Sequence, residues 1–157
     1  MKTTLLTIPR AMIAMAILLI VAMPDTRACT SAIITGKATA DGRPLIWKHR
    51  DTGTEHNRMV FSDAGRFSYI GLVNSHDAEG KEVWAGTNNQ GFSILNTASY
   101  NIQDKDDTTR VMDYEGIVMR MALERCATLA DFEHFLDTLS RPMRVEANFA
   151  AIDALGG

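Results

Sequence analysis

The 157-residue sequence has few cysteines, no excess of positive charge and no hydrophobic run long enough to cross a bilayer. Its two cysteines are too few for a disulfide scaffold, and they form no CxxC pair of the kind used in zinc or redox sites. Lysine and arginine number 16 against 19 acidic residues, so charge does not predict a nucleic-acid partner. A composition that is 46% hydrophobic and 22% charged is typical of one globular domain.

Hydrophobic residues are concentrated near the start of the chain. Lys2 and Arg10 come before an uncharged run of 13 residues over 11–23, which fits the core of a secretory signal. A membrane-spanning helix needs about 20 apolar residues, so we expect no stable span after processing. Ala28 is a small residue suited to cleavage. The sequence therefore predicts a signal peptide over 1–28 and a secreted or periplasmic chain over 29–157.

Cleavage after Ala28 would make Cys29 the first residue of the mature chain. A cysteine at this position suits two unrelated chemistries. One is lipid attachment, which would make the protein a lipid-anchored, non-enzymatic surface protein. That alternative fits less well, because Thr26 and Arg27 stand where a lipoprotein signal usually has apolar and small residues. The other chemistry is catalysis by an N-terminal nucleophile.

Alternating apolar and β-branched stretches predict strands in the first part of the mature chain. A turn over 41–44 would join the first two strands into a hairpin and bring 48–51 back to the level of Cys29. A second turn over 88–91 would join the last two, and 101–109 is predicted to be a polar loop. The predicted strands are 30–35, 45–47, 59–62, 69–74, 83–87 and 92–97.

The hydrophobic period then changes from two to about 3.6, which predicts helices. Thr128 and Asp131 resemble a capping box at the start of a second helix, which extends to Leu139. A last strand over 148–153 has no evident partner. The order of elements predicts an α+β fold. The expected apolar face of the first helix comprises Tyr114, Ile117, Val118, Met121, Ala122 and Leu123.

Three segments resemble the N-terminal-nucleophile hydrolases that cut linear amide bonds, which include the choloylglycine hydrolases and the acyl-CoA:6-aminopenicillanic acid acyltransferase-like proteins. The segments are CTSAIITGKATADG at 29–42 with LIWKHRD at 45–51, GTNNQGFSILN at 86–96, and 148–157. Lys48 stands where the choloylglycine branch has arginine, which favours the acyltransferase-like branch. The resemblance implies a four-layer αββα fold. It covers only the front part of that fold, so we expect a truncated chain with little activity of its own.

A mature Cys29 would carry a nucleophile and a base on one residue, because an α-amino group has a pKa near 7.7–8.0 and a thiol near 8.5. The α-amine would take the thiol proton and later give it to the leaving amine. Lys48 and Arg50 would lie on one strand face, where either cation could favour the thiolate. By resemblance, Asp51 would orient the α-amine and Asn96 would donate to the oxyanion.

The residues and the resemblance together predict an exported hydrolase or acyltransferase acting through an acyl-enzyme on a linear, non-endopeptidic amide of a small molecule. Its candidate catalytic residues are Cys29, Asp51, Asn96, Lys48 and Arg50. No cofactor or metal is expected, because His49, His56 and His76 match no ligand spacing and are interpreted as surface residues. Cys126 is expected to be a buried, inert thiol.

Overall fold

A computed structural model describes residues 29–99, 114–141 and 143–156. The predicted signal peptide and the loop predicted over 101–109 lie outside this part. The described residues form the α+β fold that the sequence predicts, with antiparallel sheets and two α-helices. Its elements are β1 (Thr30–Ile34), the 3-10 helix η1 (Gly36–Ala38), β2 (Leu45–His49), β3 (Asn57–Ser62), β4 (Tyr69–Asn74), β5 (Ala85–Asn88), β6 (Ser93–Ala98), α2 (Glu115–Arg125), α3 (Leu129–Thr138) and β7 (Ala147–Ile152).

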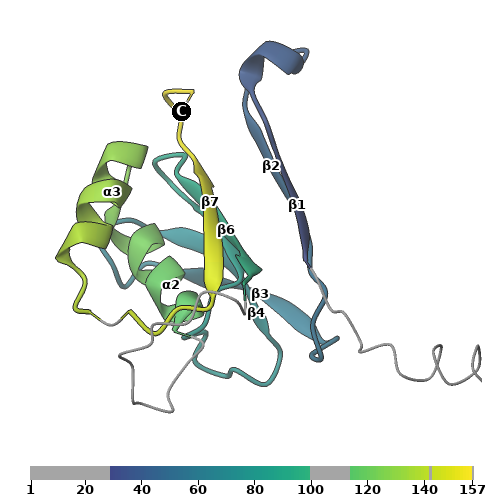
Figure 1. The fold of residues 1–157 in the computed structure, drawn as a ribbon, viewed down its shortest axis with the longest axis vertical. Coiled ribbons are helices and arrows are strands. Elements are labelled where there is room, and N and C mark those ends of the chain that lie inside the picture. Colours follow the sequence, from purple (N-terminus) through teal and green to yellow (C-terminus); the bar gives the residue numbers. More distant parts are fainter. Residues whose placement is uncertain (1–28, 100–113, 142, 157) are drawn as a thin grey trace, which may run out of the picture.

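The strands form two sheets, and the elements lie in three layers (Figure 1). One sheet has the antiparallel order β3-β4-β5-β6-β7, and the helices α2 and α3 cover one of its faces. The other sheet is the hairpin of β1 and β2, which stands on the opposite face beside β6 and β7. The hairpin that the sequence predicts is therefore confirmed, with Thr30 paired to His49 and Ile34 to Leu45.

The core lies between the five-stranded sheet and the helices. Phe132 on α3 is its aromatic centre, with the ring of Phe92 at 5.7 Å and that of Phe149 at 6.1 Å between centroids. Gly86 on β5 allows α2 to lie close to the sheet, because a Cβ at this position would lie 2.6 Å from Leu123 Cδ1 of that helix. Thr128 caps α3 and forms the predicted capping box with Asp131.

Two sequence expectations are wrong. The last strand does have a partner, since β7 pairs along its whole length with β6, from Ser93–Ile152 to Ala98–Ala147. This pairing joins strands separated by both helices, so it depends on tertiary packing that local sequence does not reveal. The buried face of α2 is also rotated from the expected one: Tyr114 is exposed, whereas Glu115 and Met119 are buried.

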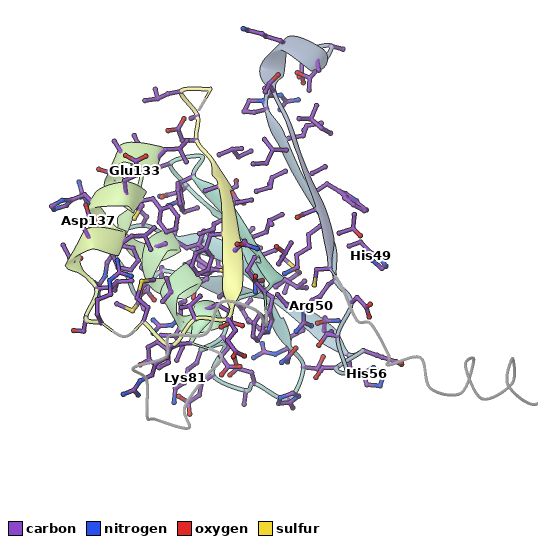
Figure 2. The ribbon with its side chains drawn as sticks, viewed as in Figure 1. His49, Arg50, His56, Lys81, Glu133 and Asp137 are labelled. Atoms are coloured by element: carbon purple, nitrogen blue, oxygen red, sulfur yellow. The ribbon has the colours of Figure 1, made fainter. Side chains whose placement is uncertain are left out.

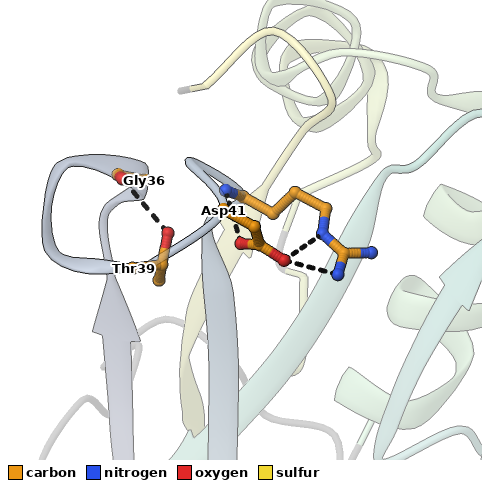
Figure 3. A network of polar contacts seen from close by, with 4 residues as sticks. Gly36, Thr39 and Asp41 are labelled. Atoms are coloured by element: carbon orange, nitrogen blue, oxygen red, sulfur yellow. Dashed lines mark hydrogen bonds and ion pairs between the residues drawn. The ribbon is translucent and has the colours of Figure 1, made fainter.

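The outer end of the hairpin is closed by local polar contacts (Figure 3). Thr39 Oγ1 donates to the carbonyl oxygen of Gly36 at 3.1 Å, and Arg43 Nε donates to Asp41 Oδ2 at 2.7 Å. Gly42 has a φ of 75°, which a glycine adopts without strain. The turn thus sets the register that brings the other end of the hairpin back to Cys29.

Candidate functional site

A cavity of about 340 Å³ lies at the inner end of the β1–β2 hairpin. All five residues that the sequence singles out line it, and they come from both sheets. The lining residues are Cys29, Lys48, Arg50, Asp51, Thr52, Asn74, Glu82, Trp84, Asn96, Ala98 and Glu115.

Cys29 directly precedes β1 and is half-buried. Because Thr30 pairs with His49, antiparallel pairing carries Cys29 to the level of the residues that follow β2. Its Sγ donates to the backbone carbonyl oxygen of Asp51 at 3.7 Å. The thiol of Cys29 therefore contacts the backbone of Asp51, and Asp51 is an exposed residue of the cavity lining.

Lys48 extends from β2 towards the five-stranded sheet. Strand alternation turns Ile46 and Lys48 inward, whereas Trp47 and His49 are exposed on the outer face of the hairpin. Lys48 Nζ donates to Asn96 Oδ1 at 2.6 Å and to the Trp84 carbonyl oxygen at 2.9 Å. Burial lowers the pKa of Lys48 to about 8, so its charge is titratable near neutral pH.

Asn96 is buried inside β6, with 5% of its surface exposed. Lysine has donors only, so the amide oxygen of Asn96 must face Lys48 and the NH₂ group must face the other way. That NH₂ group meets no acceptor in 29–99, 114–141 or 143–156. Asn96 therefore presents a fixed donor at the cavity.

Arg50 extends to a different side of the cavity from Lys48. Figure 2 shows it at the inner end of the hairpin, with His49 on the other side of the strand. Its Nη2 donates to Asn74 Oδ1 at 2.8 Å, and Nη1 donates to Asn57 Oδ1. The guanidinium also stacks 5.0 Å from the centre of the Trp84 ring. Burial lowers the pKa of Arg50, and the nearby Cys29 sulfur opposes that shift.

The structure adds residues that sequence reasoning missed. Glu115, the first residue of α2, is 5% exposed, and Trp84 has a buried Nε1 donor without an acceptor in the described part of the chain. Glu115 occupies a helix position in line with the buried Val118 and Ala122, at the spacing of three and seven residues. A charged residue on the apolar face of a helix is the signal that could have identified it.

His49, His56 and His76 are exposed, as the sequence predicts. Within the described ranges, no group of three or more His, Cys, Asp or Glu side chains is arranged so that it could hold a metal ion. Cys126 is buried, and burial raises its pKa to about 11, which keeps the thiol protonated and unreactive. Both cysteines are free. Among the helices in the described ranges, none combines the length and apolar character that a membrane span requires.

Comparison of the chain with family models, curated proteins and solved structures finds no match. The resemblance to N-terminal-nucleophile hydrolases therefore rests on residues 29–51, 86–96 and 148–157.

Proposed function

We propose that this protein, once residues 1–28 are removed, is an exported cysteine N-terminal-nucleophile amidohydrolase or acyltransferase that acts on a linear, non-endopeptidic amide bond. The observation that supports this most is the cavity itself. It brings together a half-buried thiol at Cys29, a cation at Lys48 and an amide donor at Asn96. These are the three kinds of group that acyl transfer requires: a nucleophile, charge that favours the thiolate, and a donor for the oxyanion.

The first step forms a covalent bond from Cys29 Sγ to the carbonyl carbon of the substrate. The thiol proton passes to the α-amine of Cys29, and the carbonyl π electrons move to oxygen. Asn96 Nδ2 would donate to this oxyanion, while the charge of Lys48 would stabilise both the thiolate and the oxyanion. Arg50, held by Asn74, adds positive charge on the other side of the cavity.

In the second step the tetrahedral intermediate collapses and the C–N bond breaks. The leaving amine takes the proton held by the α-ammonium of Cys29, so a neutral amine departs and a thioester remains. Water, or a second amine in the transferase case, then attacks the thioester and regenerates the thiol. Asp51 would accept from the α-amine and keep it oriented towards the sulfur.

We further propose that the three described layers belong to the four-layer αββα arrangement. Exposed apolar side chains on the hairpin side of the fold support this. On the face of the sheet away from the helices, Phe61 is 69% and Met59 is 60% exposed, and Trp47 is 52% exposed on the outer face of the hairpin. Additional strands beside the hairpin and one further helix layer would cover these side chains, and an experimental structure of the product of the full reading frame tests this.

Steady-state hydrolysis of a panel of N-acyl amides tests the proposed function. The protein should be expressed from its full reading frame, with residues 1–28 present so that the cell removes them. We expect Cys29→Ser to lower kcat/KM by at least about 1,000-fold. Cys126→Ala is the matched control, because Cys126 lies in the core away from the cavity, and it should retain activity. Equal activity in Cys29→Ser and the unmodified protein would contradict the proposal.

A further inference from the structure

We propose that Glu115 is a positioning residue that keeps Lys48 protonated beside Asn96. This inference rests on the proposed function, because it concerns the same cavity. An arginine would stay charged at any working pH, whereas a buried lysine can lose its proton. A site that depends on the charge of Lys48 therefore needs a feature that maintains it.

The fold places Glu115 and Lys48 against the same short segment, 82–84. The backbone N–H of Val83 donates to the Gly116 carbonyl oxygen at 3.1 Å, which fixes the start of α2. A Cβ on Gly116 would lie 2.9 Å from Glu82 Cβ, so only glycine allows this approach. Trp84, in the same segment, provides the carbonyl oxygen that accepts from Lys48 Nζ at 2.9 Å. One segment thus holds both the lysine and the start of the helix that carries Glu115.

The charges around Lys48 support this role for Glu115. The hydrogen bonds of Lys48 go to two neutral oxygens, which orient the ammonium group but carry no full charge. Burial and the charge of Arg50 both lower the pKa of Lys48, whereas the charges of Cys29 and Glu115 raise it. The other charged side chains lining the cavity are Asp51 and Glu82.

Glu115 is the first residue of α2, where the partial positive charge of the helix N-terminus favours a negatively charged side chain. It also shares the cavity with two cations, Lys48 and Arg50. A carboxylate and an ammonium group that line the same cavity each favour the charged form of the other.

Titration of Lys48 followed by NMR tests the inference without any need for turnover. The readout is the Lys48 side-chain chemical shift as a function of pH, in processed protein carrying Cys29→Ser. We expect Glu115→Gln to move the midpoint down by about one pH unit. Glu115→Asp should move it less, because the charge is retained. Glu82→Gln is the matched control, since Glu82 lines the same cavity, and it should leave the midpoint in place.

The pH profile of kcat/KM then separates positioning from a purely structural role. In the Lys48 protein, Glu115→Gln should shift the alkaline limb to lower pH. In a Lys48→Arg background the same substitution should leave the limb in place, because arginine does not titrate there. An unchanged Lys48 midpoint in Glu115→Gln, or equal shifts in both backgrounds, would overturn the inference. Loss of the proposed amidase activity alone would not, because the NMR titration is independent of it.

Discussion

Two asparagines of the β5–β6 hairpin, Asn88 at the turn and Asn96 at the cavity, are buried almost equally and use their side chains differently. Asn88 Nδ2 donates to the carbonyl oxygens of Leu123 at 2.9 Å and Cys126 at 2.7 Å. Its Oδ1 accepts from backbone N–H groups of its own turn at 3.0 and 3.1 Å. Asn96, in contrast, uses its oxygen on Lys48.

The side-chain amide of Asn88 is structural, whereas that of Asn96 is a candidate functional group. Every hydrogen-bonding group of Asn88 has a backbone partner, so the side chain ties the turn to the end of α2 and has no capacity left for a ligand. The NH₂ group of Asn96 has no acceptor in the described part of the chain and lies at a cavity. The buried fraction of the two side chains therefore does not distinguish their roles. The roles differ in whether each side-chain donor and acceptor already has a partner within the protein.

The largest effect expected from this comparison is on catalysis by Asn96→Ala. Loss of one oxyanion donor raises the barrier by about 2.7–4 kcal/mol, so kcat should fall about 100- to 1,000-fold. The measurement is steady-state hydrolysis of an N-acyl amide, with the free energy of unfolding recorded for the same variant. A variant that retains full kcat would show that Asn96 is structural, like Asn88.

Asn88→Ala should have the opposite pattern. It leaves two buried carbonyl groups and two backbone N–H groups without their partner, and the free energy of unfolding should fall by about 2–3 kcal/mol. Urea denaturation measures this loss. The kcat of the molecules that remain folded should change little, because Asn88 does not line the cavity. A large fall in kcat without a loss of stability would contradict the assignment of a structural role to Asn88 and a catalytic role to Asn96.

The smallest expected effect is the pH dependence that comes from Lys48. Burial lowers its pKa to about 8, so the charge that supports the thiolate and the oxyanion is present below this pH and lost above it. We expect kcat/KM to fall about tenfold between pH 8.5 and 9.5. Lys48→Arg should move this alkaline limb to higher pH, and an unchanged limb would show that another group titrates.

Local pattern was sufficient to predict most of the strands and the capped helix. Tyr69–Asn74 has the bounds that the sequence predicts, because its apolar residues are flanked by turn residues. Thr128 and Asp131 predict the start of α3, because a capping box depends on residues only three apart. The partner of β7 could not be predicted in this way, since β6 and β7 are far apart in sequence and β7 also packs through Phe149 against Phe132 of α3.

The candidate site was predictable to the extent that it is local. The turn over 41–44 predicts a hairpin, and the hairpin brings Lys48, Arg50 and Asp51 to Cys29. Trp84 and Glu115 reach the cavity through long-range contacts of the sheet and of α2, so neighbouring sequence does not connect them with Cys29. The different directions of Lys48 and Arg50 also depend on their long-range partners, Asn96 and Asn74.

Catalysis through an acyl group on Cys29 is tested most directly by intact-protein mass spectrometry of the processed protein, quenched in acid during turnover of an N-acyl amide. We predict a chain that begins at Cys29 and carries one added acyl group, located on the peptide that contains Cys29 and absent in Cys29→Ser. A diacylglycerol adduct on Cys29, or a chain that still carries residues 1–28 while turning over the amide, would contradict it.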